Sequence, residues 1–308
     1  MQLSIVTTLY KSAAYIDEFY QRITAEAKKI TQDYEIIFVD DGSPDNSLEK
    51  AVALHQQDSK VTVIELSRNF GHHKAIMTGL AHARGDYVFL IDSDLEEEPE
   101  LLEQFWQKLQ QDKSVDVVYG VQESRKGGVF EQISGFLFYD LFNFFSEIKI
   151  EKNVSVVRVM KRKYVENLLR HKESELIFIG VCALTGYKQV GSFFKKGFRG
   201  ESNYNLSRKI NMAVDMITSF SVKPLKMVFL TGLIIMLISF LYISYLTFNK
   251  IINNHIYDGW TTLMISIWFV TGLLMVSIGI LGIYLSKIFL EVKGRPRSII
   301  KNKYGEDK

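Results

Sequence analysis

Residues 36–43, IIFVDDGS, run from a short apolar stretch into a pair of carboxylates at Asp40 and Asp41. Residues 87–94, YVFLIDSD, repeat this pattern and end in Asp92 and Asp94. Apolar runs of this length, rich in β-branched and aromatic residues, predict buried strands. Both acidic signatures therefore stand where a strand ends, which is the edge at which open α/β sheets bind ligands.

Short apolar runs alternate with helical stretches through the first part of the chain. The predicted strands cover residues 3–9, 35–39, 61–66, 87–91 and 115–119, and the predicted helices cover 14–29, 47–57, 72–83 and 99–110. This alternation predicts an α/β domain with a mostly parallel sheet. No Gly-x-Gly-x-x-Gly or P-loop sequence follows any of these strands, which disfavours dinucleotide oxidoreductases and P-loop NTPases.

The composition excludes several classes of protein. The chain has 308 residues with 47% hydrophobic content, so it is not disordered, and its formal net charge of +2 gives no sign of nucleic-acid binding. Cys182 is the single cysteine, which excludes an internal disulfide and a multi-cysteine zinc site.

The acidic pair Asp92 and Asp94 is suited to a divalent metal. Carboxylates spaced in this way can offer hard oxygen ligands to Mg²⁺ or Mn²⁺ and leave other positions open to substrate phosphates. The alternative is a solvated acidic turn. An EF-hand is excluded, because Glu97 occupies the position at which a calcium loop needs glycine.

Residues 66–73, LSRNFGHH, follow a third strand at the same edge. Arg68 is placed to reach either a nucleotide phosphate or a structural carboxylate, and the sequence does not decide between them. His72 and His73 are interpreted as residues of a helix start, because neighbours on a helix point about 100° apart and do not chelate a metal together.

Two long stretches near the C-terminus, residues 227–248 and 260–286, carry no charged side chain. Each exceeds the roughly 20 residues that cross a bilayer as a helix, although a buried helical pair is the alternative. Lysines and arginines flank the outer ends of the pair, whereas the connecting loop has Lys250 as its one basic residue. The positive-inside rule therefore predicts a two-span hairpin with both termini in the cytoplasm, and the N-terminus lacks the pattern of a signal peptide.

These patterns divide the chain into three parts. Residues 1–222 are predicted to form a catalytic domain, 223–290 the transmembrane hairpin and 291–308 a basic cytoplasmic tail. The apolar stretch 130–148 is interpreted as a core or interfacial helix, and the basic stretch 199–220 as a helix lying on the bilayer.

With these features in view, the chain resembles the family 2 glycosyltransferases of the polyprenyl-phosphate type, which include dolichyl-phosphate mannose synthase and bactoprenol glucosyltransferases. The motifs that carry the resemblance span almost the whole sequence: FVDDGS at 38–43, LSRNFGH at 66–72, DSDL at 92–95, GESNY at 200–204 and EVKGRPR at 291–297. The resemblance implies a GT-A, Rossmann-like domain followed by a C-terminal two-helix transmembrane hairpin.

The resemblance also implies roles for individual residues. Asp40 and Asp41 would contact the nucleoside, with Arg68 and Asp92 also in the nucleotide-sugar site, and Asp92 with Asp94 would hold the metal. The candidates to grip acceptor or donor phosphates during the transfer are Arg125, Arg199, Ser202 and Lys209.

Two positions depart from the family pattern. Close relatives commonly show Gln-Asp-Pro-Pro-Glu where residues 96–100 read EEEPE, so the charge around the metal is altered. Relatives often carry an aspartate two residues before the arginine that matches Arg158, and here that position is Val156. A carboxylate proposed for the acceptor side is therefore missing.

The expected activity is an inverting transfer of a hexose from a nucleotide diphosphate sugar, in the first place a UDP-sugar, to undecaprenyl phosphate. It would occur at the cytoplasmic face of a bacterial inner membrane, in the assembly of cell-surface polysaccharide, with a flippase and a second glycosyltransferase using the product. Small residues in the second span would allow a homo-oligomer. Two alternatives remain: transfer to a hydroxyl of a lipid-linked saccharide, with Glu173, Glu175 or Asp140 as base, and an inactive membrane scaffold.

Overall fold

The computed structural model describes residues 1–123, 144, 151–173, 177–197, 214–215, 217–219, 221–253 and 259–305. The chain forms two compact units. The first combines Met1–Asp140, Ile148–Asn205 and Gly294–Lys308, and the second combines Leu141–Glu147 and Leu206–Lys293.

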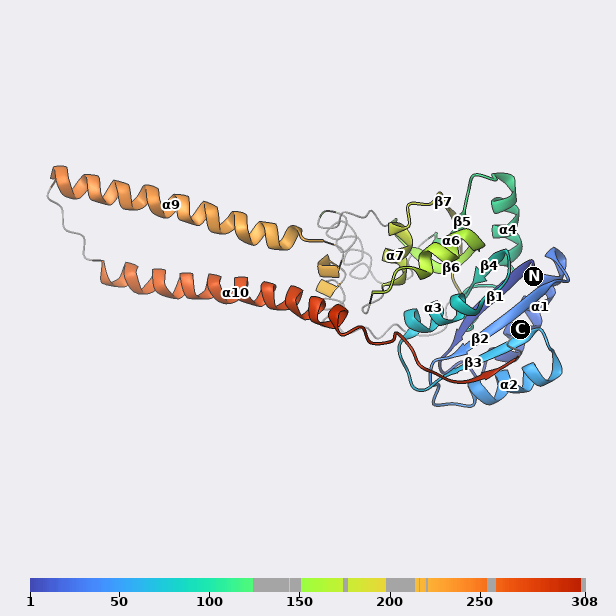
Figure 1. Ribbon diagram of the computed structural model, residues 1–308. Coiled ribbons are helices and arrows are strands. Elements are labelled where there is room, and N and C mark those ends of the chain that lie inside the picture. The colour runs from blue at the N-terminus through green and yellow to red at the C-terminus, as the bar shows by residue number, and fades with distance from the viewer. Residues whose placement is uncertain are drawn as a thin grey trace. The chain divides into compact units, whose positions relative to one another are not determined.

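The first unit is built on an eight-stranded mixed sheet with the order β7-β5-β6-β4-β1-β2-β3-β8 (Figure 1). Its strands are β1 (Leu3–Leu9), β2 (Tyr34–Asp40), β3 (Val61–Leu66), β4 (Tyr87–Leu90), β5 (Val117–Gln122), β6 (Val154–Lys161), β7 (Gln189–Phe194) and β8 (Ile300–Tyr304). The first four strands are parallel to one another, whereas β6 is antiparallel to β4 and β5. The α/β class expected from the sequence is confirmed.

Helices cover both faces of this sheet. They are α1 (Ile16–Ile30), α2 (Ser47–Gln57), α3 (His72–His82), α4 (Leu101–Gln111), α6 (Arg162–Leu169) and α7 (Phe178–Leu184). Apolar residues of α1, α2 and α4 pack in one cluster with the sheet, and those of α3, α6 and α7 pack in a second cluster. Two covered faces explain why β1, β2 and β3 are buried along their whole length.

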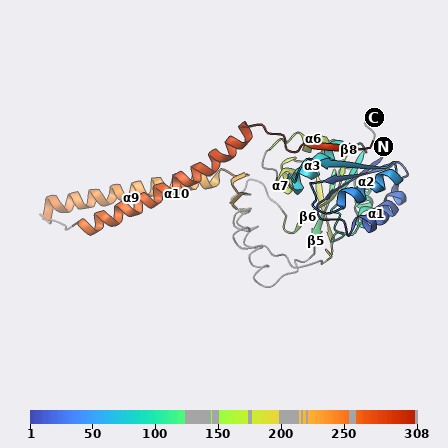
Figure 2. The ribbon, with the colours of Figure 1, turned by 90° about the horizontal axis from the view of Figure 1, so that it is seen from below.

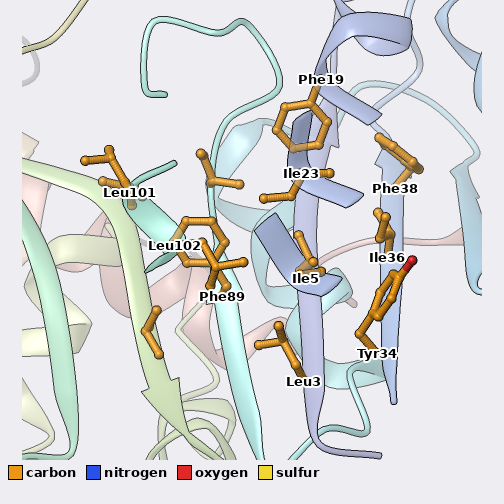
Figure 3. Close-up of a cluster of buried hydrophobic side chains, with 14 of the residues drawn as sticks. Leu3, Ile5, Phe19, Ile23, Tyr34, Ile36, Phe38, Phe89, Leu101 and Leu102 are labelled. Atoms are coloured by element: carbon orange, nitrogen blue, oxygen red, sulfur yellow. The ribbon is translucent and has the colours of Figure 1, made fainter. Parts of the chain in front are cut away.

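The first cluster shows how the helices pack on the sheet (Figure 3). Phe19 of α1 meets Phe38 of β2 edge to face, with ring centroids 6.1 Å apart. Leu102 of α4 and Phe89 of β4 belong to the same cluster and are fully buried. This packing fixes the strands, and therefore the positions at which their carboxyl ends emerge.

Strand β8 was not predicted from the sequence. It lies within residues 291–308, which the sequence presents as a basic tail, and it pairs antiparallel with β3 at the sheet edge (Figure 1). Three of its five residues are polar or basic, IKNKY, so the segment has no apolar run to mark a strand.

The second unit contains two long helices, α9 (Lys223–Asn253) and α10 (Trp260–Val292), which lie side by side (Figure 2). Two windows, Lys223–Phe248 and Ser266–Val292, are long and apolar enough to cross a membrane, with mean hydropathies of 2.4 and 2.1. None of the residues whose burial the structure describes in either segment is buried within the chain, which argues against the core helices of a soluble protein. The helices expected around 130–148 and 199–220 lie almost wholly outside the described residues.

Candidate active site

The two acidic signatures emerge at the same edge of the sheet. Asp40 is the last residue of β2, and Asp92 follows β4 by two residues. Strand β1 lies between them and pairs in parallel with both, matching Leu9 to Asp40 and Val6 to Leu90. The Ser93 hydroxyl donates to the carbonyl O of Thr8 at 2.9 Å, which fastens the second signature to the end of β1. The predicted arrangement of the strand ends is therefore present.

Asp41 organises the neighbouring loop. Its Oδ1 accepts a hydrogen bond from the N–H of Phe70 at 2.7 Å, and its Oδ2 accepts one from the N–H of Gly71 at 3.0 Å. Gly42 lies against the same loop with φ +62°, and a Cβ there would stand 2.6 Å from the carbonyl C of Arg68. The turn after β2 and the β3–α3 loop, residues 67–71, are therefore locked together by a carboxylate and by close backbone contact.

Asp40 is buried but incompletely satisfied. Its side chain is 2% exposed, and its Oδ2 accepts a bond from the N–H of Ser43 at 3.3 Å. The Oδ1 atom has no hydrogen-bond partner among the described residues. Burial raises the pKa of Asp40 to about 6. A buried acceptor without a partner at a ligand-binding edge is suited to an N–H or O–H donor from a ligand.

Asp45 has a structural role in the adjacent turn. Its Oδ1 accepts from the hydroxyls of Ser43 and Ser47, each at 2.5 Å, and its Oδ2 accepts from the N–H of Ala13. Although burial acts to raise it, these hydrogen bonds lower the pKa of Asp45 to about 2. Asn46 occupies the N-cap position of α2 without a side-chain cap bond, so Asp45 holds this helix start instead.

Asp92 and Asp94 lie on a tight loop after β4. Oδ1 of Asp94 accepts a bond from the N–H of Glu96 at 3.0 Å, and Leu95 between them adopts φ +60°, a left-handed conformation that branched and bulky residues rarely take. Burial raises the pKa of Asp94, and the charge of Asp92 adds to this effect. A cation at this loop would relieve the repulsion between the two carboxylates.

The donor set fits a metal only in part. Within the described residues, no group of three or more His, Cys, Asp or Glu side chains is arranged to hold a metal ion. Two carboxylates and open positions match Mg²⁺, which usually keeps several waters and is held by one or two carboxylates together with substrate phosphates. Asp92 and Asp94 therefore fit a metal that arrives with a diphosphate, rather than a metal bound by protein ligands alone.

The acidic run after Asp94 is largely compensated. Glu96 forms an ion pair with Lys196, with Oε2 and Nζ 2.8 Å apart, and the N–H of Gly197 donates to the Glu96 carbonyl O. Glu97 is 1% exposed and accepts a hydrogen bond from Ser155, and burial raises its pKa to about 8. Glu96 is therefore ion-paired and burial favours the neutral form of Glu97, so the loop after β4 is less anionic than its sequence indicates.

Val156 gives no carboxylate to the site. It packs against the second apolar cluster. Arg158, two residues on, is 1% exposed, donates to the carbonyl O atoms of Ser155 and Val156, and lies over the Phe178 ring at 4.8 Å. Glu173 is the candidate base that the structure describes: its Oε1 lies 3.4 Å from Nδ1 of His171, and its buried Oε2 has no partner in the described part of the chain.

Several predicted site residues belong to the part of the chain that the structure does not describe. Arg125, Arg199, Ser202 and Lys209 lie outside the described residues, as do Glu175 and Asp140. Arg68 is described: its guanidinium donates to the carbonyl O of Asn69 at 3.2 Å and lies over the Phe70 ring.

Sequence reasoning missed Lys196 and Tyr10. Lys196 lies beyond β7, a strand that the sequence did not predict. Although burial disfavours its charged form, the hydrogen bond to Glu96 raises the pKa of Lys196. Tyr10 follows β1 at the site edge and is 49% exposed, and the N–H of the next residue, Lys11, donates to the Ser43 hydroxyl at 2.7 Å. An aromatic residue directly after a predicted strand was the available signal for Tyr10.

Comparisons with known proteins show what this chain is similar to. A putative glycosyltransferase of Mycobacterium tuberculosis (strain CDC 1551 / Oshkosh) is 47% identical over 307 residues, which cover 100% of this chain and 90% of the relative. The bactoprenol glucosyl transferase of Shigella phage SfII is 33% identical over 307 residues, 99% of each chain. Among solved structures, the mannosyltransferase PcManGT from Pyrobaculum calidifontis in complex with GDP-Man and Mn²⁺ has a TM-score of 0.49 at 18% identity, covering 71% of this chain and 63% of that one.

The fold and the relatives define a glycosyltransferase with a GT-A-type α/β domain. The sequence profile described as Glycosyl transferase family 2 matches residues 4–169. This chain belongs to that family.

Proposed function

We propose that this protein transfers a hexose, with inversion, from a nucleotide diphosphate sugar to a polyprenyl phosphate at the cytoplasmic face of a bacterial inner membrane. The observation that carries the proposal is the pair of acidic strand ends at one sheet edge, in a chain that also has two candidate membrane spans. Similarity to a bactoprenol glucosyl transferase over 99% of both chains supports the lipid acceptor. Undecaprenyl phosphate and a UDP-hexose are the specific substrates proposed.

The donor would bind across the ends of β1, β2 and β3. Oδ1 of Asp40 is the buried acceptor available to an N–H or O–H of the nucleoside, and the exposed ring of Tyr10 is available to stack on a base. Arg68, on the β3–α3 loop, is assigned to the donor phosphates. Asp41 would act mainly by holding that loop, because both of its oxygens already accept backbone N–H bonds.

Asp92 and Asp94 would hold a Mg²⁺ or Mn²⁺ ion. Such an ion, when bound, would neutralise charge on the departing nucleoside diphosphate. The protein's own contribution is to fix the two carboxylates, through the Ser93 bond to Thr8 and the Glu96 N–H bond to Asp94. Binding donor and acceptor in line would then supply most of the remaining catalysis.

A phosphate acceptor is compatible with the valine at position 156. The second pKa of a phosphate monoester is about 6, so the acceptor oxygen is already anionic at neutral pH and needs little help from a base. We propose that Arg125, Arg199, Ser202 and Lys209 bind the acceptor or donor phosphates.

We further propose that residues 1–222 form the catalytic domain and residues 223–290 the transmembrane hairpin. The chain would form homo-oligomers, and a flippase and a second glycosyltransferase would use the product.

A hydroxyl acceptor on a lipid-linked saccharide is the second candidate. The observation that favours it is the Glu173 carboxylate, which has one oxygen beside His171 and a buried oxygen with no partner in the described residues. A hydroxyl nucleophile needs a general base, and a carboxylate next to an imidazole is able to serve as one.

The test uses the purified full-length protein in detergent or lipid with undecaprenyl phosphate, Mg²⁺ or Mn²⁺, and separate UDP-hexoses and GDP-mannose. Lipid products are read by mass spectrometry, and Asp92→Asn is the inactive control. A lipid that gains one phosphate-linked hexose, equally in wild type and Glu173→Gln, supports the phosphate acceptor. Absence of product with every donor, from folded protein that binds nucleotide, would reject it in favour of the hydroxyl acceptor.

A further inference from the structure

Glu65 is a buried carboxylate on β3 that has no part in the proposed transfer. It is 6% exposed and stands opposite Asp40 in the parallel register of β2 and β3. Its Oε1 accepts from Nζ of Lys301 at 2.5 Å, and its Oε2 accepts from Nδ2 of Asn302 at 2.7 Å and from the Tyr304 hydroxyl at 3.3 Å. All three donors belong to β8, so one carboxylate accepts hydrogen bonds from three side chains of the C-terminal strand.

The residues just before β8 contact both the first residue of the β3–α3 loop and the helix that follows the loop. The N–H of Ser67, the first residue of the loop, donates to the carbonyl O of Ile299 at 2.9 Å. The Thr78 hydroxyl of α3, the helix that follows the loop, lies 2.6 Å from the hydroxyl of Ser298. The β3–β8 pairing shifts register between Glu65 and Leu66, at the point where β3 passes into the loop. The segment 298–304 therefore contacts the chain before and after the loop that carries Arg68.

Glu65 also ties this segment to the first acidic signature. Its charge acts to raise the pKa of Asp40, its neighbour on β2. Burial alone would raise the pKa of Glu65, but the bonds from Lys301 and Asn302 bring it below its ordinary value. Strand β8 thus supplies a cation next to two neighbouring buried carboxylates, an arrangement whose disruption leaves uncompensated buried charge.

We infer that segment 298–304 is a structural part of the nucleotide-sugar site, with Glu65 as the positioning residue through which it holds the β3–α3 loop. This inference rests on the proposed donor site. The second long helix, α10, ends at Val292, and segment 298–304 follows it closely in the sequence. The chain that leaves this helix would therefore form part of the proposed donor site. Loss of β8 from the sheet would weaken donor binding more than it disturbs the acidic loop after β4, which has its own hydrogen bonds to the end of β1 and within the loop.

The test is Lys301→Glu in the full-length protein, which sets a second carboxylate against Glu65. The expected result is a donor KM raised about tenfold with a smaller change in kcat. The β3–α3 loop is loosened directly, whereas the loop that carries Asp92 and Asp94 keeps its own Ser93 and Glu96 hydrogen bonds and is affected only through His72. Hydrogen exchange in residues 66–72 should accelerate. The double variant Glu65→Lys with Lys301→Glu reverses the ion pair and should restore both measurements in large part.

The matched control is Lys188→Glu. Lys188 lies directly before β7, the strand at the other edge of the sheet, and its Nζ is 2.9 Å from Oδ2 of Asp112. The same substitution there should leave the donor KM and the exchange of residues 66–72 unchanged. If Lys301→Glu does not fold, the milder Asn302→Ala replaces it and should give the same pattern with a smaller change.

The outcomes separate this inference from the proposed function. Unchanged exchange in residues 66–72, or an equal effect of Lys188→Glu, would overturn the inference even if wild type glycosylates the lipid. If wild type transfers no sugar to polyprenyl phosphate, the proposed function fails. Calorimetric nucleotide binding to wild type and to Lys301→Glu, together with the hydrogen exchange of residues 66–72, then decides whether β8 supports the donor site.

Discussion

Nε2 of His72 lies 3.5 Å from Oδ1 of Asp92, and Nδ1 of the same ring lies 3.1 Å from Oγ1 of Thr8. His72 is the first residue of α3, as predicted, but its ring also joins the loop after β4 to the end of β1. Gly71, directly before it, is held by Asp41. The two acidic signatures are therefore connected through one loop, from Asp41 through Gly71 and His72 to Asp92.

This connection predicts that His72 positions Asp92 for the metal. A ring protonated on Nε2 would donate to Asp92 and accept the Thr8 hydroxyl on Nδ1, and loss of such a supporting partner typically costs about 10–100-fold in metal affinity. We expect that order of loss for His72→Ala in a calorimetric Mn²⁺ titration with UDP present, and partial recovery in His72→Gln. The control is His82→Ala at the other end of α3, where Nδ1 contacts the carbonyl O of Thr78. Equal Mn²⁺ affinity in His72→Ala and wild type would refute the prediction.

Asp94→Asn should separate activity from stability. Burial and the neighbouring Asp92 charge raise the pKa of Asp94, so its ionised form is disfavoured in the folded protein without a cation. We expect transfer to fall by more than about 100-fold, because a metal ligand is lost, while the thermal midpoint without metal stays equal or rises. Excess EDTA should abolish the wild-type activity as well. A variant that keeps wild-type turnover would exclude Asp94 from the metal site.

The pH dependence of stability should change in Asp40→Asn. The pKa of Asp40 is raised from 3.8 to about 6, so the folded state keeps this proton longer than the unfolded state does. The free energy of unfolding of the wild type therefore falls as the pH rises between these values, by at most about 3 kcal/mol. Asparagine has no proton to lose, so the stability of Asp40→Asn relative to wild type should increase across this window. Urea unfolding at several pH values measures it, and parallel pH profiles would contradict the expectation.

Gly42→Ala should destabilise the protein more than Gly71→Ala. Both glycines have positive φ, +62° and +99°, so each substitution costs about 1 kcal/mol or more in backbone strain. A Cβ on Gly42 would also stand 2.6 Å from backbone atoms of Arg68 and Asn69, whereas nothing lies within 4 Å of one on Gly71. Denaturant unfolding should show the larger loss, and donor KM the larger rise, for Gly42→Ala. Equal losses would mean that the two turns are not in close contact.

Local sequence was sufficient for the strands that carry the acidic signatures and for the two long helices. Runs such as residues 36–39 and 87–91 are apolar because both faces of their strands are covered, and the residue at which each run stops marks the ligand-binding edge. The spans were predictable for a similar reason, since length and lack of charge are properties of a single segment. Asp40, Asp41, Asp92 and Asp94 could therefore be assigned to one edge from the sequence.

Contacts between distant segments were decided by the tertiary structure alone. The polar segment IKNKY becomes a strand because Glu65, more than two hundred residues earlier, accepts bonds from Lys301, Asn302 and Tyr304. Lys196 neutralises Glu96 only because β7 runs parallel to β5 and ends at the site edge. The sequence by itself determined which residues end strands and which segments can span a bilayer. Which charges meet depends on strand order and register, and these are set by long-range packing that no local pattern records.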